Sequence, residues 1–501
     1  MSVLSLMIFL PLVAAVVLAV ARGLPDAVAP WAWVGVTLVE VLLVGVLWAR
    51  YETPALSASG AGALAFDEQV EWIPGLGASY HVGLDGLSLP LMALTAVVFA
   101  ACAVYALRES TRPRSQAALF CFLQTTCLGL FAAADLIVFF LFFDLSIVGM
   151  YFAIAGWGHG NAQKSALQFF LYTFLGSLAL LLGFIGLYVA SGTFDMVELA
   201  ADPPLVGTGI TSGLVLAAVL VGLAVKTPTV PFHTWLPPAH TDAPAVGSAV
   251  LAGVLLKMGT YGFVRIAMPM LPDAWRSFAW VVITVGVVSV VWGALVALAQ
   301  TDLKRMVAYT SVNHMGYVVV AVGAAGVVGG SAEQARALAV TGAVTQMVSH
   351  GLITGALFLL AGMLHRRAGT YEMSRFGGLA GRAPRYSAMF AVAAFASLGL
   401  PGLSGFVAEV QVFAGSIAAV PWTAVALVGI LLTAALFLRA VQRLLTGEPG
   451  ELTASVGDVR ASELLAVAPL LVLATLIGVL PRPLLEVVEP AAQMVVALVG
   501  R

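Results

Sequence analysis

The fifteen residues KTPTVPFHTWLPPAH, positions 226–240, place one lysine, two histidines and four prolines inside a very apolar chain. Proline lacks an amide hydrogen, and its ring clashes with the preceding helical turn. Pro228 and Pro231 therefore predict that a helix breaks just after Lys226. The stretch thus combines an interrupted backbone with three protonatable side chains, Lys226, His233 and His240.

The composition of the whole chain is that of a polytopic membrane protein. Of its 501 residues, 61% are hydrophobic and 10% are charged, and the mean hydropathy is +1.02. About 20 apolar residues in a helix cross a hydrocarbon layer of ~30 Å, and stretches of that length recur throughout. The predicted fold class is an all-α polytopic membrane protein with about fourteen transmembrane helices, near 3–20, 30–49, 86–107, 115–132, 135–155, 165–190, 212–235, 243–267, 277–299, 306–326, 336–364, 386–413, 420–443 and 462–480.

The distribution of Lys and Arg predicts the orientation of these helices. The stretch 3–20 has no small-residue cleavage site of the signal-peptide kind, so we expect it to be retained as the first span. Fifteen of the 23 basic residues then fall on one side, which the positive-inside rule makes cytoplasmic, with both termini outside. These fifteen are Arg22, Arg108, Arg112, Arg114, Lys164, Lys304, Arg305, Arg366, Arg367, Arg375, Arg382, Arg385, Arg439, Arg443 and Arg460; Arg50, Arg265, Arg276, Arg336, Arg482 and Arg501 lie opposite.

Two lysines and two acids fall inside predicted spans. Lys226 and Lys257 belong to neither loop set, Asp144 lies near the middle of the fifth span, and Glu409 lies in the second half of the twelfth. A charge at a helix centre costs roughly 2.5–3.5 kcal/mol on insertion scales, so each should face the bundle or a water-filled cavity. A protonatable series results when the histidines of these stretches are added, namely His233, His240, His314 and His350.

Each of these residues also has a structural interpretation. Asp144 and Lys226 could form an ion pair that holds two helices, although buried pairs are often neutral for stability. His314 or His350 alone could be a hydrogen-bonded core histidine, and His240 fits a helix-end role as well as a proton-exit role. The joint occurrence of so many protonatable groups in spans favours a functional series.

A second break lies in the twelfth span. In SLGLPGLSGFVAEV, 397–410, Pro401 and Gly402 interrupt the helix shortly before Glu409. If spans 4–8 and 9–13 are two repeats, the broken helix is fourth in each, and five spans per repeat force opposite orientations, an inverted repeat. The predicted regions are 1–114 with three helices and an acidic outer loop at about 50–84, a first repeat at 115–267, a second at 277–443, and a C-terminal helix and tail at 444–501.

Several motifs resemble the antiporter-like, proton-pumping membrane subunits of respiratory complex I, in the branch that contains bacterial subunit M and mitochondrial subunit 4. The resemblance covers about residues 80–445, and Glu409 favours this branch because its sister subunit N more usually carries lysine there. The motifs are GLDGLSLPLMALT (83–95), MYFAIAGWG (150–158), KTPTVPFHTWLPPAHTDAPAVGSAVLAGVLLKMGTYGFVR (226–265), QTDLKRMVAYTSVNHMGYV (300–318), SHGLITGALFLLAGML (349–364) and GLPGLSGFVAE (399–409).

The resemblance implies a fold of fourteen helices with two inverted five-helix repeats, and it implies roles for the buried groups. Asp144 and Lys226 would form an input-side pair, and Lys257 would hold a proton at the centre. Glu409 would lie on the output side, with His233, His314 and His350 linking these groups. The family usually carries glutamate at position 144, so the shorter aspartate requires a closer approach of the helices or a bridging water.

The same resemblance implies a function, partners and a location. The chain would move protons across a bacterial inner membrane, driven by quinone reduction elsewhere in the complex, beside subunits of the L and N type and without nucleic acid. FMN, iron–sulfur clusters and quinone are expected in partner subunits. No cofactor is expected in this chain, since it has no CxxC pattern, P-loop or GxGxxG loop in a strand-to-helix setting.

Two other interpretations remain open. The first is a subunit of a multisubunit sodium/proton antiporter or of a membrane-bound hydrogenase, because these relatives share the lysine and the broken helices. The second is a membrane scaffold in which the buried charges only hold helices together.

Overall fold

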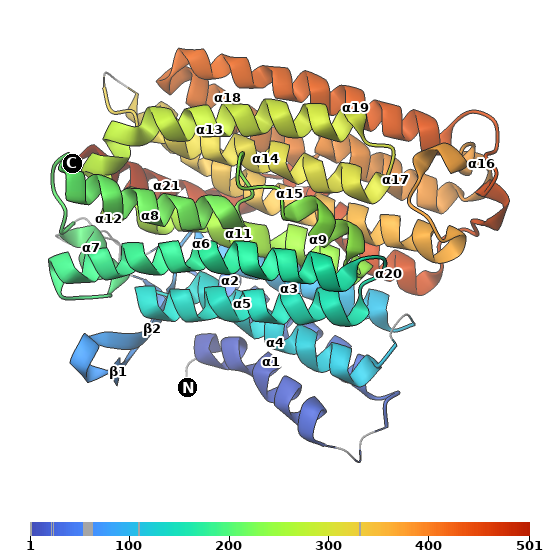
Figure 1. Ribbon diagram of the computed structural model, residues 1–501, viewed down its shortest axis with the longest axis horizontal. Coiled ribbons are helices and arrows are strands. Elements are labelled where there is room, and N and C mark those ends of the chain that lie inside the picture. The colour runs from blue at the N-terminus through green and yellow to red at the C-terminus, as the bar shows by residue number, and fades with distance from the viewer. Residues whose placement is uncertain (1–2, 22, 24, 54–63, 109–110, 330–331) are drawn as a thin grey trace.

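The computed structural model describes residues 3–21, 23, 25–53, 64–108, 111–329 and 332–501. Its helices run side by side along one direction (Figure 1). Within the described residues, twelve helical segments are long and apolar enough to cross a membrane. Eleven of them contain one long helix each: α1 Val3–Val20, α2 Ala29–Ala49, α3 Ser88–Ala106, α4 Pro113–Ala132, α5 Leu136–Trp157, α6 Ala162–Ser191, α13 Pro272–Ala299, α15 Glu333–Ala368, α19 Leu427–Leu445, α20 Ala461–Val479 and α21 Arg482–Gly500. The twelfth is the composite segment Ala245–Met270, and the long helix α14 Leu303–Ala325 is not one of the twelve.

The remaining elements are short or composite. α7 Met196–Ala201 and α16 Leu379–Arg382 lie in connections. One membrane-length segment is assembled from α10 Ala245–Val250, a π-helical turn Leu251–Leu255, α11 Leu256–Gly262, a second π-helical turn Phe263–Ala267 and α12 Met268–Met270. The strands are β1 Ala65–Ile73 and β2 Ala78–Leu84.

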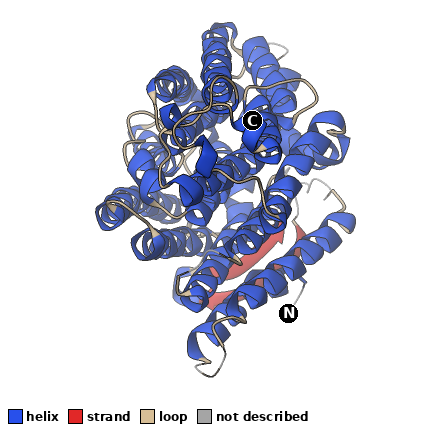
Figure 2. Cartoon of the chain, turned by 90° about the vertical axis from the view of Figure 1, so that its right-hand side faces the viewer, coloured by secondary structure: helices blue, strands red, loops and turns tan. Residues whose placement is uncertain are grey.

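The two ends of the bundle differ in character. One end, at the right of Figure 1, carries the end of α5 and the starts of α6 and α14, with Lys164, Arg305 and Arg366; we call it the basic end. The other carries both strands, α7 and α21, and we call it the hairpin end. Seen along the helices from the basic end, the strands lie at the N-terminal edge of the bundle (Figure 2).

Both predicted breaks coincide with interruptions of helix. α8 Ile210–Lys226 ends at Lys226, and α9 Leu236–Asp242 begins only after a non-helical segment that contains Pro228 and Pro231. α17 Pro384–Ser397 and α18 Ser404–Ala419 are likewise separated by a segment that contains Pro401 and Gly402. Four stretches of helix end in the interior, where their last carbonyls and first amides need other partners.

Two short bridges support an inverted repeat. Asp135 caps α5 and pairs in antiparallel fashion with Asp195, which follows α6 at the hairpin end. Asp302 caps α14 and pairs in the same way with Glu372, which follows α15 at the basic end. The same arrangement of a capped helix and the segment after the next helix therefore occurs twice, at opposite ends of the bundle.

The predicted loop 50–84 is wrong in its second half, and the chain is therefore not purely helical. Residues 54–63 lie outside the described residues, but 65–84 form an antiparallel hairpin, with Glu68 opposite Val82 and Val70 opposite Tyr80. The turn uses Gly77 at φ +61°, a conformation that glycine adopts without steric cost. The acidic residues expected in a loop thus lie on a strand.

A histidine attaches this hairpin to the helices. His81 Nε2 lies 2.8 Å from Asp67 Oδ1 on β1, and its Nδ1 lies 2.6 Å from Asp195 Oδ2 just before α7. Gln69 Nε2 donates to the same carboxylate at 3.3 Å, and the amide of Ser79 donates to Asp135 at 3.1 Å. The hairpin is thus held by polar contacts as well as by packing.

The predicted C-terminal tail contains a helix, α21, at residues 482–500. Its buried residues recur every three or four positions, so one side of it faces the protein. Arg276 at the start of α13 donates to the carbonyl of Val499 at 3.1 Å, and Arg336 at the start of α15 donates to that of Val496 at 3.4 Å. These contacts place α21 at the hairpin end.

The histidine attachment predicts a pH window for the stability of the hairpin. Burial alone would lower the pKa of His81, but hydrogen bonds and negative charge from Asp195 and Asp67 outweigh burial and raise it. Burial would raise the pKa of Asp195, but its hydrogen bonds with His81 and with backbone amides lower it. The histidine contribution is therefore lost as pH rises through its raised pKa, and the aspartate contribution as pH falls through its lowered one.

We expect hydrogen exchange of the amides at 65–84 in the assembled complex to accelerate above the ordinary pKa range of histidine. Rates must first be corrected for the intrinsic pH dependence of exchange. A His81→Gln variant should lose this pH dependence, and amides of α3 should not show it. Equal pH dependence in wild type and His81→Gln would contradict the role given to His81.

Candidate functional site

Lys257 lies at the centre of the buried series. It sits on α11 between the two π-helical turns and is fully buried. Its Nζ is 2.7 Å from His350 Nδ1 and also donates to the carbonyl of Ala252, which belongs to the first π-helical turn. Single π-turns leave backbone groups available and are frequent at functional sites. The local irregularity thus supplies a partner for a charge that lipid could not solvate.

His350 connects Lys257 with the second broken helix. A protonated Lys257 donates to Nδ1 of His350, which leaves the ring proton on Nε2. The His350 ring centroid lies 5.4 Å from that of His314, and His314 Nε2 donates to the carbonyl of Ser397 at 3.2 Å, where α17 ends. The interruption of α17 and α18 therefore provides a free carbonyl that orients a histidine.

A small cavity joins these histidines to Glu409. It has a volume of about 10 Å³ and is lined by His314, His350, Ser397 and Glu409, among others. Roughly 10–15 Å³ of such space, with two or more polar partners, is what one water needs. Buried His314 Nδ1 and His350 Nε2 have no hydrogen-bond partner among the described atoms, so the cavity is polar enough to hold that water.

Glu409 owes its position to a glycine at the break. Its side chain is 5% exposed, on α18. Gly399 has φ +77°, and a Cβ added there would collide with Glu409 Oε2. Ser349 and Ser404 hydroxyls, 2.7 Å apart, tie α15 to the start of α18. The break thus lets the carboxyl approach the backbone between the two half-helices.

At the first broken helix, Lys226 and Asp144 are not in direct contact. Lys226 Nζ donates to Ser146 Oγ at 3.1 Å and lies 4.8 Å from the centre of the Phe143 ring. Within the described residues no hydrogen bond or ion pair joins Lys226 to Asp144, and buried Asp144 Oδ1 has no partner. Lys226 is bound to Ser146, whereas the Asp144 carboxyl is hydrogen-bonded by Ser177, so a contact between the pair needs a movement of the side chains or a bridging water.

The two histidines of the opening stretch lie apart from each other. His233 Nε2 accepts from Trp292 at 3.3 Å, on the side of α13, and no described contact joins His233 to Lys226 or Lys257. His240 is fully buried on α9, stacked 4.6 Å from the Phe358 ring of α15, and neither of its ring nitrogens has a partner among the described residues. His240 therefore lies in the last turn of a helix, and that turn is in the protein interior.

Glu40 and Lys304 are among the buried charged residues that sequence reasoning missed. Glu40 on α2 is fully buried, with no partner for either carboxyl oxygen among the described atoms. The criterion that found Asp144, an acid inside an apolar span, would have found it too. Lys304 was assigned to a loop, but it lies in the first turn of α14 and is fully buried; a count of loop charges cannot detect burial under neighbouring loops.

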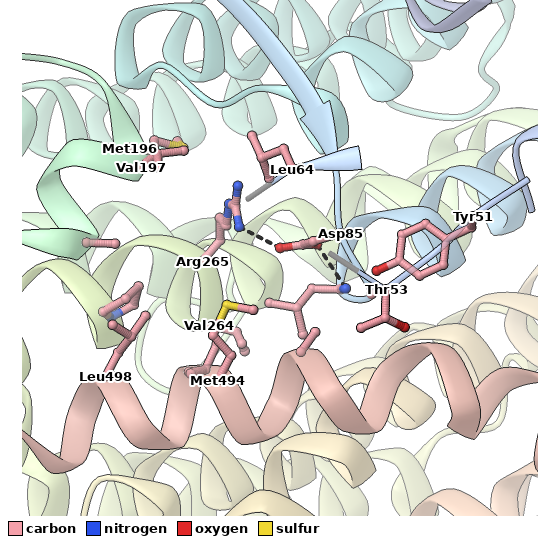
Figure 3. Close-up of a pocket in the computed structure, with 16 residues that line it drawn as sticks. Tyr51, Thr53, Leu64, Asp85, Met196, Val197, Val264, Arg265, Met494 and Leu498 are labelled. Atoms are coloured by element: carbon pink, nitrogen blue, oxygen red, sulfur yellow. Dashed lines mark hydrogen bonds and ion pairs between the residues drawn. The ribbon is translucent and has the colours of Figure 1, made fainter. Parts of the chain in front are cut away.

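A buried ion pair closes the hairpin end of the Lys257 helix. Tyr261 and Arg265 follow Lys257 at four-residue steps, hence on one side of the helix. Arg265 points to Asp85 at 2.5 Å, within a pocket of about 50 Å³ bordered by α21 (Figure 3). Guanidinium does not give up its proton in proteins, so Arg265 is a fixed positive charge between Lys257 and this end.

Taken together, the geometry suits proton transfer through the middle of the membrane. The groups are a lysine in direct contact with a histidine, a second histidine, a cavity of water size and a carboxyl, all buried. Imidazole can take a proton on one nitrogen and release it from the other. The series runs laterally from α5 and α8 through α11, α15 and α14 to α18.

The glycine at the second break allows a matched test. Alanine at Gly399 (φ +77°) or at Gly402 (φ +91°) costs roughly 1–2 kcal/mol of backbone strain. Only at Gly399 would the new Cβ also displace Glu409, because nothing lies within 4 Å of a Cβ at Gly402. We expect Gly399→Ala to lower the proton-to-electron ratio of the assembled complex well below that of Gly402→Ala. Equal ratios would show that the position of Glu409 is unimportant.

Comparisons with known proteins agree with this geometry. The family model described as "NADH:quinone oxidoreductase/Mrp antiporter, TM" matches residues 133–434. NADH-quinone oxidoreductase subunit M of Rhodobacter capsulatus is 38% identical over 506 residues, covering 98% of this chain and 95% of that one. F(420)H(2) dehydrogenase subunit M of Methanosarcina mazei is 37% identical over 450 residues, covering 88% of each chain.

Solved structures also share the fold of this chain. A chain of respiratory complex I from Thermus thermophilus superimposes with a TM-score of 0.89 at 30% identity, covering 100% of both chains. The resemblance to the antiporter-like subunits of complex I, in the branch of subunit M, is thereby confirmed. This chain belongs to the NADH:quinone oxidoreductase/Mrp antiporter family of membrane subunits.

Proposed function

We propose that this chain is a proton-translocating membrane subunit of a complex I-type quinone oxidoreductase. The observation that carries the proposal is the group of buried protonatable residues centred on the Lys257–His350 contact, which continues through His314 and the cavity to Glu409 at the second broken helix. Insertion of so many ionisable groups is costly, and stability alone gives no reason for it.

Proton movement along the series needs only small steps. Protonated Lys257 passes a proton to Nδ1 of His350, and the proton on Nε2 leaves toward the water-sized cavity and Glu409. The cation thus moves, and a neutral lysine and a neutral imidazole remain. Rotation of the His350 ring, which returns its proton to the side of the cavity, and a proton arriving at Lys257 together reset the pair. No bond other than N–H and O–H bonds changes.

Lys226 and Asp144 would supply the control. Lys226 is held by Ser146, and Asp144 lies on the same helix two residues away, with a free oxygen. If Asp144 turns toward Lys226, the lysine keeps its proton; if it turns away, desolvation favours release. The aspartate, shorter than the usual glutamate, must swing or use water to make this contact, so the structure with Lys226 bound to Ser146 represents the open arrangement.

Arg265 supports exit at Glu409 rather than along the Lys257 helix. Arg265 is held at 2.5 Å by Asp85, and α21 borders the pair. The hairpin end of the Lys257 helix is therefore closed by a fixed ion pair, whereas a water-sized cavity lies toward Glu409.

The energy for this movement must come from partner subunits. We place FMN, iron–sulfur clusters and quinone in those partners and none in this chain, with neighbours of the L and N type on its flanks. The location is then a bacterial inner membrane, with the basic end cytoplasmic and both chain termini outside. The electron donor differs among relatives, since one is named for NADH and another for F(420)H(2).

Sodium/proton antiport is the second candidate function, because the matching family model also covers Mrp antiporters. The two functions differ in what crosses the membrane. A scaffold is a third alternative, and it predicts that the buried lysines matter for assembly alone.

The central test is a Lys257→Met variant of the intact complex in sealed vesicles. Methionine keeps the length and packing of lysine but carries no proton. We expect an assembled complex that reduces quinone with a lowered proton-to-electron ratio, in the absence of sodium. Lys164→Met, an exposed lysine on α6, is the matched control and should leave the ratio unchanged.

The outcomes separate the three functions. A normal proton-to-electron ratio in the assembled Lys257→Met complex would indicate that the chain is a scaffold. Pumping by the wild type that requires sodium, and a sodium flux lost with Lys257, would favour the antiporter function.

A further inference from the structure

The basic end brings together protonatable side chains that the proposed series does not use. His159 lies between α5 and α6, and His365 and Tyr371 lie at and just after the end of α15. His159 Nε2 is 3.1 Å from the Tyr371 hydroxyl, the His159 and His365 ring centroids are 4.7 Å apart, and His365 stacks on Tyr371 at 4.3 Å. We call His159, His365 and Tyr371 the basic-end triad.

Burial increases from this triad into the protein. His159 and His365 are partly exposed, and Tyr371 is 8% exposed. Lys304, whose Nζ lies 5.1 Å from the centre of the Tyr371 ring, is fully buried, as is His240 beyond it. Water therefore reaches the two histidines first, and access to water decreases inward through Tyr371 to Lys304.

Lys304 leads directly to the backbone around His240. Its Nζ donates to the carbonyl of Ala243 at 2.5 Å and to that of Thr241 at 3.4 Å, the residue next to His240. His240 lies within electrostatic range of both Lys304 and Lys257. The imidazole therefore stands between the cation of the basic end and the cation at the centre of the membrane.

His240 carries two unexplained polar atoms. Both ring nitrogens are buried without a partner among the described atoms, although a neutral imidazole has one N–H to donate and one lone pair to fill. Buried polar groups in native proteins are nearly always satisfied, and ordered water does this where protein does not. The site calls for water on both sides of the ring, the arrangement of a proton relay.

Helix α15 runs from His350, near the middle of the membrane, to His365 at the basic end. His350, Thr354, Phe358 and His365 lie within about 80° of one another around its axis, by the 100° turn per residue of an α-helix. Phe358 stacks on His240, and Thr354 lies one turn from His350. The 15 residues from His350 to His365 span about 22 Å, the distance from mid-membrane to the basic end.

From this arrangement we propose that the basic-end triad, with Lys304, is the inlet through which protons enter from the basic end, and that His240 relays them to Lys257 and His350. The inference rests on the proposed proton translocation and names its point of uptake. A proton from water is taken by a triad histidine, which releases another to the hydroxyl of Tyr371 or to water beside Lys304. His240 accepts on one nitrogen and releases from the other, and no net charge stays behind.

The protonation state of His159 suits an inlet. Burial, together with the nearby charge of Lys304, lowers the pKa of His159 despite the opposing contact with Asp242. The ring is therefore neutral at neutral pH and free to accept a proton. The groups that face it are Lys304, Asp242, His365 and Tyr371.

A purely structural role for the triad is the alternative. His159 Nδ1 lies 3.0 Å from the carbonyl of Asp242, and Asp242 accepts from Ser165 at 2.5 Å, so the residues do fasten loops together. A structural role in holding loops together explains the contacts of His159. It does not explain why both ring nitrogens of His240 lack a described hydrogen-bond partner or why Lys304 is buried. The two roles differ in their response to an added proton carrier.

The test uses the intact complex in proteoliposomes with the basic end accessible. Tyr371→Phe keeps the ring that stacks on His365 and faces Lys304 but removes the hydroxyl, and His365→Ala leaves a space of imidazole size. We expect each to slow proton uptake by roughly a hundredfold, the low end of what a positioned proton donor contributes. Added imidazole should restore the rate of His365→Ala, and it should leave Tyr371→Phe slow.

The control is Arg375→Gln at the same end, where Arg375 and Glu451 form an exposed ion pair 2.9 Å apart outside the basic-end triad. It should keep normal uptake. Normal uptake in assembled Tyr371→Phe, or a slow His365→Ala that imidazole does not restore, would overturn the inlet. The Lys257→Met variant then tests proton translocation independently of the inlet. A lowered proton-to-electron ratio in that variant would still support the proposed proton translocation, whereas a normal ratio would refute it.

Discussion

The structure depends on one constraint, namely that an ionisable side chain inside a hydrocarbon layer must have polar partners or water. Lys257 meets it with His350 and with a carbonyl freed by a π-helical turn. Lys226 meets it with Ser146 where α8 ends. Irregular backbone therefore accompanies both of these lysines, because an unbroken helix keeps its carbonyls and amides for itself. Helix breaks and charges are two parts of one solution.

The same constraint gives the series a direction. Arg265 and Asp85 form a fixed ion pair at one end of the Lys257 helix, under α21. The cavity toward Glu409 and the unsatisfied nitrogens of His240 mark places where water fits. The Asp135–Asp195 and Asp302–Glu372 bridges at opposite ends support an inverted pair of units, and two units of opposite orientation can place one hydrated half-passage toward each side of the membrane.

Much of this could be predicted from sequence, because the signals are local. A proline removes a hydrogen bond wherever it stands, so Pro228 and Pro401 locate interruptions without knowledge of neighbours. A charge in an apolar span must be buried from lipid, so Lys226, Lys257 and Glu409 stand out. The exception is Glu40, which the same rule covers and which was missed. The family motifs then gave these residues an expected order.

Features that depend on contacts between distant segments could not be predicted. Nothing local shows that His81 would bind Asp195 and hold a hairpin, or that Lys304 would be buried under loops that follow α9 and α15. The separation of Asp144 from Lys226 depends on how two helices pack, which the loss of one methylene alone does not determine. His159 lies in a loop, and its contact with Tyr371 joins residues 212 positions apart in the chain, so no local signal marks it.

The central claim is that water completes a proton path through the buried series. The most direct measurement is a map of the intact complex that resolves ordered waters within this chain. The account predicts a water in the cavity between His350 and Glu409 and waters at both ring nitrogens of His240, each within hydrogen-bond distance of its neighbours. If apolar side chains filled the cavity and the spaces beside His240, and its ring nitrogens still had no hydrogen-bond partner, the proposed path would be contradicted.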